Sequence, residues 1–247
     1  MLYDTPPEDI LFLDIETVPQ TYHYQDLDES LRHLFDQKTA YRQTAETGPE
    51  ELYDQAAIWA EFGKVVTVAF GVLTPDADKG YLLNIHSVAS DDETEVLEKT
   101  AGVLNQFEQI VGKRGYGRRA FLCAHNGKEF DFPYLARRML IKRVKLPGIL
   151  KVHGKKPWET PFCDTLQLWR FGDYKHYVSL ELLAHILGLP TPKNDISGKD
   201  VARVYYEEKD LPRIERYCRH DVSTLVNVYL RMRESEPVPP ENIFIKE

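Results

Sequence analysis

The chain has 247 residues, with 31 Lys+Arg and 39 Asp+Glu for a net charge of −8, and 43% of its residues are hydrophobic. This mixture excludes wholesale disorder, collagen-like and low-complexity proteins, and the length suits one large α/β domain or two small ones. The longest apolar stretch, residues 65–73, is too short to span a bilayer, and residues 1–4 show no signal peptide. The three cysteines form no CxxC pattern, so we expect a cytoplasmic protein without disulfides and without a membrane partner.

Three strands are predicted in the first third of the chain. Residues 10–15 form a short apolar run typical of a buried strand. Residues 65–73 predict a second strand and residues 81–87 a third, and the turn-rich residues between these two favour a hairpin. Residues 20–62 are acidic and carry apolar side chains at helical spacing, which predicts an inserted helical segment.

The remaining elements are mostly helical. They are a helix over 96–111, a strand over 120–124, a helix over 132–141, a strand end at 161–163, broken helical segments from 166 and a long helix over 211–232. Strands first, helices later and no internal repeat favour a single α/β domain with a mixed sheet over residues 1–234. Residues 235–247 are expected to be a loosely held C-terminal extension.

Charge is unevenly distributed along the chain. Residues 1–62 contain 14 acids and three bases, whereas residues 137–156 contain eight bases and no acid. A basic run of this kind is most often a solvated surface, although beside acidic chemistry it suits contact with nucleic-acid phosphates. Trp158, like the other tryptophans, is interpreted as a packing residue.

Asp14 and Glu16 are the first candidate site residues. Side chains alternate along a strand, so both carboxylates point to one face of the strand over residues 10–15. Two neighbouring acids on a buried strand repel each other and are costly to desolvate, and bound divalent cations would remove that cost. The alternative, that the strand ends at Ile15 and both acids are solvated, stays open at this point.

Two further segments carry acids. Asp131 precedes Pro133 and a helical pattern, which is also how an ordinary helix N-cap looks. Tyr217 and Asp221 are four residues apart on an amphipathic helix and therefore share one face, which a simple polar pair would also explain. Asp164 is expected to be an N-cap.

Taken together, these segments resemble the DEDD superfamily of 3′–5′ exonucleases in its tyrosine branch. More narrowly, the chain is similar to stand-alone exonucleases related to the proofreading domain of family B DNA polymerases. The matching motifs are FLDIET at 12–17, NGKEFDFPYL at 126–135 and YCRHDV at 217–222, with support from CDTL at 163–166 and SLELL at 179–183. The histidine of the other branch falls at Arg216, which favours the tyrosine branch. Ser197 stands where close relatives carry an acid, so the role of the 193–198 loop stays open.

The resemblance implies a ribonuclease H-like α/β fold whose central mixed sheet is flanked by helices, with the strand of Asp14 in the middle. It implies that Asp14, Glu16, Asp131 and Asp221 hold two divalent cations, Mg²⁺ or Mn²⁺, roughly 3.5–4 Å apart. Tyr217 would orient the attacking water, because its ordinary pKa near 10 makes it a poor base at neutral pH.

The expected activity is hydrolysis of phosphodiester bonds at nucleic-acid 3′ ends, releasing nucleoside 5′-monophosphates. Single-stranded ends fit best, because a terminal nucleotide must leave the duplex to enter such a site, and DNA is favoured over RNA. The expected substrate-binding residues are Asn126, Phe130, Phe132, Arg137 and Arg138. The alternatives are a catalytically silent nucleic-acid-binding module of the same fold, or another metal-dependent nucleotide phosphoesterase.

Overall fold

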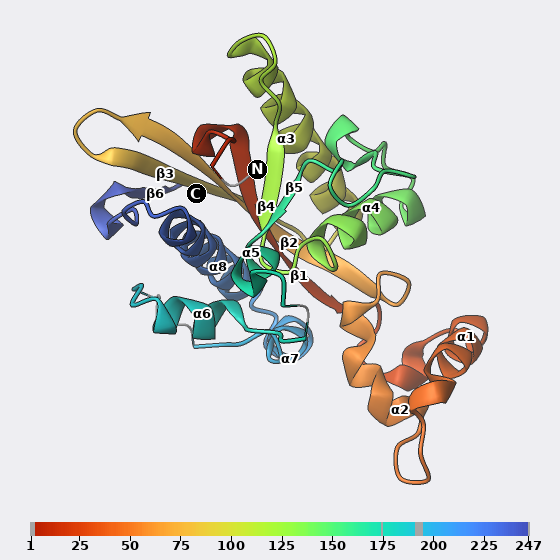
Figure 1. Cartoon of the computed structure of the whole chain (residues 1–247). Coiled ribbons are helices and arrows are strands. Elements are labelled where there is room, and N and C mark those ends of the chain that lie inside the picture. Colours follow the sequence, from red (N-terminus) through yellow and green to blue (C-terminus); the bar gives the residue numbers. More distant parts are fainter. Residues whose placement is uncertain (1–2, 174, 191–194, 247) are drawn as a thin grey trace.

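The computed structural model describes residues 3–173, 175–190 and 195–246, which fold around a six-stranded mixed sheet (Figure 1). Its strands are β1 (Ile10–Pro19), β2 (Gly63–Asp76), β3 (Gly80–Ala89), β4 (Phe121–Ala124), β5 (Phe162–Asp164) and β6 (Ile243–Ile245). In the order β5-β4-β1-β2-β3-β6, strand β1 pairs in parallel with β4 and antiparallel with β2. The strand that carries the first acidic pair therefore lies in the interior of the sheet, as expected.

Helices cover both faces of the sheet. They are α1 (Glu29–Thr39), α2 (Pro49–Leu52), α3 (Glu93–Lys113), α4 (Asp131–Ile141), α5 (Thr165–Arg170), α6 (Leu180–Ile186), α7 (Val201–Arg203) and α8 (Leu211–Met232). Helices α3 and α4 lie on one face, and α8, flanked by α5 and α6, lies on the other (Figure 1). This arrangement confirms the α/β class. Within the described residues, none of the helices combines the length and the apolarity that a membrane crossing requires.

Alternation along β1 divides the core into two clusters. Leu11, Leu13 and Ile15 pack under α3 and α4, whereas Ile10 and Phe12 pack under α8. Helix α8 approaches the sheet closely at Gly71, where a Cβ atom would lie 2.7 Å from Cγ1 of Val222. The glycine thus lets α8 lie directly on the sheet beside β1.

Residues 20–62 are helical, as predicted, and have a small core of their own. Buried Leu27, Phe35 and Phe62 belong to this cluster, together with Leu52, Tyr53 and Ala56. The end of the insertion is anchored to the main body, because the Thr17 hydroxyl donates to the Ala57 carbonyl over 2.9 Å. In Figure 1 helices α1 and α2 project away from the sheet.

The C-terminal segment differs from the prediction of a loose extension. Strand β6 pairs in parallel with β3, and Val238 is 2% exposed in the cluster under α8. The Asn227 side chain accepts from the Val238 backbone N–H and donates to its carbonyl. The prediction was wrong because the chain turns after α8 through a left-handed residue, Glu234, and returns to the sheet edge, where its backbone pairs with β3. In the 193–198 loop, residues 193–194 lie outside the described residues, and Ser197 donates to the Asp200 carboxylate.

Candidate active site

Asp14 and Glu16 lie on the face of β1 that meets α8. The Cys218 thiol on α8 donates to the carbonyl and to the carboxylate of Asp14, both over 3.3 Å. Glu16 is 8% exposed, and one possible ligand atom from each of Asp14, Glu16 and Cys218 lies within 4.8 Å of the others. The strand does not end at Ile15 but continues to Pro19, so the solvated alternative for these two acids does not apply.

Asp131 is the first residue of α4 and is buried, with 3% exposure. The preceding turn takes a left-handed backbone at Asn126, with φ of 63°, and Asp164 accepts hydrogen bonds from the backbone N–H groups of Asn126 and Lys128. Asp164 also caps α5, as predicted, by accepting from the N–H of Leu166. The buried Asp164 carboxylate therefore fixes the turn that positions Asp131 at the start of α4.

Tyr217 and Asp221 point into the same site from α8. The Tyr217 hydroxyl donates a hydrogen bond to the Asp221 carboxylate, which lowers the pKa of Asp221, but burial outweighs it and raises that pKa to about 6. Burial, followed by the charges of Asp221, Glu16 and Asp14, raises the pKa of Tyr217 far above its ordinary value. The phenol is therefore protonated at neutral pH and acts as a donor.

The four carboxylates form one electrostatic cluster. Burial raises the pKa of Asp14 well above its ordinary value, and the charges of Glu16, Asp221 and Asp131 add to the effect. Burial and the charges of Asp221 and Asp131 do the same for Glu16. Burial raises the pKa of Asp131 to about 7, against backbone hydrogen bonds that lower it. A strand, a turn–helix junction and a late helix thus bring Asp14, Glu16, Asp131 and Asp221 together.

This donor set suits hard divalent cations. Carboxylate oxygens are the ligands that Mg²⁺ and Mn²⁺ favour, and a cation would relieve the repulsion and burial that raise these pKa values. Cys218 does not belong to the donor set, because burial and then the charge of Asp14 raise the pKa of its thiol well above the ordinary value. A protonated thiol donates to Asp14 and is a poor metal ligand.

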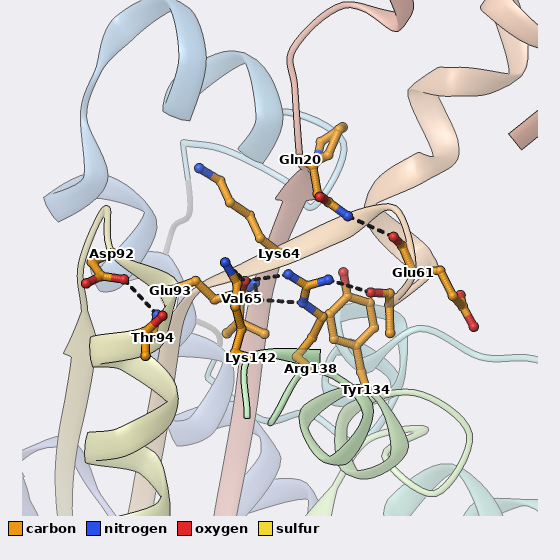
Figure 2. Close-up of polar contacts among 12 residues, drawn as sticks. Gln20, Glu61, Lys64, Val65, Asp92, Glu93, Thr94, Tyr134, Arg138 and Lys142 are labelled. Atoms are coloured by element: carbon orange, nitrogen blue, oxygen red, sulfur yellow. Dashed lines mark hydrogen bonds and ion pairs between the residues drawn. The ribbon is translucent and has the colours of Figure 1, made fainter. Parts of the chain in front are cut away.

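Two of the predicted substrate contacts are corrected by the structure. Phe132 is 1% exposed and its ring packs against Phe162, with centroids 4.5 Å apart. Arg138 is 2% exposed and binds Glu93 through Nε and Nη2, at 2.7 and 2.5 Å, while Nη1 donates to the Ala60 carbonyl (Figure 2). Each side chain is buried against a different partner, Phe162 for Phe132 and Glu93 for Arg138, so neither is free to contact a substrate. Asn126 and Phe130 are half-buried beside Asp131, and Arg137 is exposed on α4.

Two neighbours of the cluster carried no signal in the sequence. Cys218 is one of three dispersed cysteines, and nothing in its spacing indicates a hydrogen bond to β1. Tyr177 is 66% exposed, and after burial the charge of Asp131 contributes to raising the pKa of its hydroxyl, which places this loop residue near the site. Glu129, two residues before Asp131, is a further acid of the same motif, but it is exposed and lies 3.8 Å from Arg170. We therefore leave Glu129 out of the cluster.

Comparison with known proteins identifies a family and a similar fold. The model of a family described as a predicted 3′–5′ exonuclease related to the exonuclease domain of PolB matches residues 58–238. That range includes Asp131, Tyr217 and Asp221 and leaves β1 outside. The family B DNA polymerase of the hyperthermophilic archaeon Pyrobaculum calidifontis has a similar structure, with a TM-score of 0.54 and 14% identity.

The structural match covers 90% of this chain and 24% of the polymerase chain, so the likeness concerns about a quarter of that protein. At this identity it establishes the fold, and with the mixed sheet it confirms the expected ribonuclease H-like architecture. No curated protein matches the sequence.

Proposed function

Because the chain belongs to the family of predicted 3′–5′ exonucleases related to the exonuclease domain of PolB, we propose that it is a metal-dependent 3′–5′ exonuclease. The observation that carries the proposal is the convergence of four carboxylates, buried at Glu16 and Asp131 and half-buried at Asp14 and Asp221, with one tyrosine from segments far apart in the sequence. Such a cluster has a high electrostatic cost in the free protein, and perturbed acids of this kind mark functional sites.

In this proposal Asp14, Glu16, Asp131 and Asp221 hold two divalent cations, Mg²⁺ or Mn²⁺. When bound, such cations stabilise negative charge on the phosphate and on the leaving 3′ oxygen. Tyr217 hydrogen-bonds and orients the attacking water, because its raised pKa prevents it from acting as a base at neutral pH. Asn126, Phe130 and Arg137 contact the terminal nucleotides, and the product is a nucleoside 5′-monophosphate.

The favoured substrate is a single-stranded 3′ end, and DNA is preferred by analogy with the polymerase-related family. A carboxylate cluster between the interior strand β1 and helix α8 has to receive the terminal phosphodiester without its pairing partner. Exposed Arg137 lies on α4, which begins at Asp131, and can pair with a phosphate of the entering strand.

The decisive experiment compares one oligonucleotide labelled at its 5′ end with the same oligonucleotide labelled at its 3′ end. With Mn²⁺ we expect a ladder of 5′-labelled fragments shortened one nucleotide at a time, and immediate release of a labelled mononucleotide from the 3′-labelled strand. EDTA should abolish both and added Mn²⁺ should restore them.

A strand that is bound and stays intact would instead favour a silent nucleic-acid-binding module. Hydrolysis of free nucleotides alone would favour a nucleotide phosphoesterase. Matched DNA and RNA strands in the same assay test the preference for DNA.

A further inference from the structure

A basic surface lies at the end of the sheet opposite the carboxylate cluster. Strands β4 and β5 are parallel and in register, with Leu122 beside Phe162 and Ala124 beside Asp164. The carboxyl ends of these strands lead to Asn126 and Asp164 at the candidate site. Their amino ends receive the loops over residues 114–120 and 142–161, which Figure 1 shows at the same end of the molecule.

These loops are basic in an acidic protein. Residues 113–119 contain four bases and no acid, and residues 142–156 contain six bases and no acid. A cavity of about 260 Å³ lies between the two loops, lined among others by Arg118, Arg119, Lys155 and the acid Glu108. Arg119 also donates to the Glu159 carbonyl, which ties the two loops together.

Several of these bases have no acidic partner in the parts of the chain that the structure describes. Arg114 and Arg118 pair with Asp9, and Lys142 lies 3.6 Å from Glu93. By contrast, the exposed side chains of Lys151, Lys155 and Lys156 form no ion pair among those residues. Unpaired exposed bases are available to an external polyanion.

An exposed tryptophan accompanies the bases. Trp158 is 72% exposed, contrary to the packing role expected for it, and Nζ of Lys156 lies 5.3 Å from its ring centroid. Basic side chains interleaved with an exposed aromatic ring are the pattern that binds single-stranded nucleic acid, by phosphate pairing and base stacking. An exposed tryptophan also suits protein and membrane interfaces, so the choice of nucleic acid rests on the proposed nuclease site at the other end of α4.

We propose that Lys151, Lys155, Lys156 and Trp158 bind the strand upstream of the 3′ end that enters the candidate site. This inference rests on the proposed function and names the part of the substrate that the basic surface holds. Helix α4, with 11 residues, runs from Asp131 towards this surface and is about 16 Å long. At 3.4 Å per stacked nucleotide, the strand needs at least about five nucleotides to reach from one place to the other.

The test uses the triple variant Lys151→Gln/Lys155→Gln/Lys156→Gln of the full chain. The matched control is Lys79→Gln/Lys99→Gln/Lys246→Gln, which removes the same charge from exposed lysines elsewhere. Substrates are a trinucleotide, too short to reach the surface, and a 25-nucleotide strand.

For the 25-nucleotide strand we expect the triple variant to raise KM about tenfold or more with kcat unchanged. Cleavage of the trinucleotide should stay within about twofold of wild type. An equal loss on both substrates, or no loss on either, overturns the inference.

Binding without hydrolysis separates this inference from the proposed function. Fluorescence anisotropy with the labelled 25-nucleotide strand in EDTA should show about tenfold weaker binding for Trp158→Ala. The slope of log K against log salt should fall by about 2 in the triple variant, at roughly 0.7 per lost phosphate contact. If wild type cleaves neither substrate, the proposed function fails and this measurement still decides the surface. Binding by the triple variant equal to that of the control contradicts the inference.

Discussion

Asp14→Ala and Asp221→Ala should each lower the rate of 3′-end hydrolysis by about a thousandfold or more. Each removes a carboxylate ligand from a cluster in which the charges of the other acids raise the pKa of Asp14. A factor of a thousand corresponds to about 4 kcal/mol of transition-state stabilisation. We expect a loss of this size when a cation site loses one of its carboxylate ligands. The measurement is kcat on a single-stranded oligonucleotide with saturating Mn²⁺.

The same variants should keep or gain thermal stability in EDTA. The pKa values of these acids are raised mainly because they are buried, so removing one relieves repulsion in the metal-free fold. Tyr217→Phe serves as the comparison within the site, because it loses one hydrogen bond to Asp221 and leaves every carboxylate in place. Its activity should fall far less. Near-full activity in purified Asp14→Ala or Asp221→Ala would refute the assignment.

Arg138→Met should lower the free energy of unfolding by about 3–5 kcal/mol, because it leaves Glu93 charged, buried and without its main partner. The guanidinium makes two bonds to Glu93 and one of 2.8 Å to the Ala60 carbonyl, and both side chains of the ion pair are at most 3% exposed. Glu93 also accepts from the Val65 N–H over 2.9 Å. Figure 2 shows how these contacts join α3, α4, β2 and the end of the insertion.

Urea denaturation measures this effect, with Lys142→Gln as the control. Lys142 is exposed and lies 3.6 Å from the same carboxylate, so its loss should cost less than about 1 kcal/mol. The double variant Glu93→Met/Arg138→Met should recover part of the loss and not all of it, since the Val65 N–H then lacks its acceptor. Equal stability of Arg138→Met and wild type would mean that the buried pair contributes nothing to the fold.

Much of the fold could be predicted because the relevant signals are local. The apolar run at residues 10–15 and the hairpin between β2 and β3 follow from patterns of a few residues, and the long helix was predicted at the bounds that α8 has. Strand β6 could not be predicted, because three residues in a proline-rich tail become a strand only by pairing with β3. The burial of Arg138 could not be predicted either, because Arg137 and Arg138 are adjacent residues of the same type. Only packing against Glu93 and Ala60 places Arg138 inside.

The acids of the site were predictable by type and order, through the resemblance and not through any single motif. What the sequence could not supply is their environment. The hydrogen bond from the Cys218 thiol to Asp14 joins residues 204 apart in the chain. The hydrogen bonds from the 126–128 turn to Asp164 depend on β4 and β5 lying side by side.

The raised pKa values predict how pH acts on the metal-free protein. A carboxyl whose folded pKa lies above its ordinary value contributes stability that is present at low pH and is lost as pH rises through the folded value. Asp131, at about 7, and Asp221, at about 6, therefore destabilise the metal-free fold between about pH 4 and pH 7. Each pKa unit corresponds to about 1.4 kcal/mol, so raised values of about 7 and about 6 destabilise the metal-free fold by several kcal/mol. Cations compete with protons for these oxygens, so their affinity should rise over the same interval.

Thermal unfolding with and without Mn²⁺, at pH 5 and pH 8, therefore tests most directly whether the four distant acids form one cation site. We expect Mn²⁺ to raise the Tm of wild type strongly at pH 8 and weakly at pH 5, and to leave Asp14→Asn/Asp221→Asn unchanged at both. An equal rise in wild type and the double variant, or no rise in wild type at pH 8, would contradict a shared cation site.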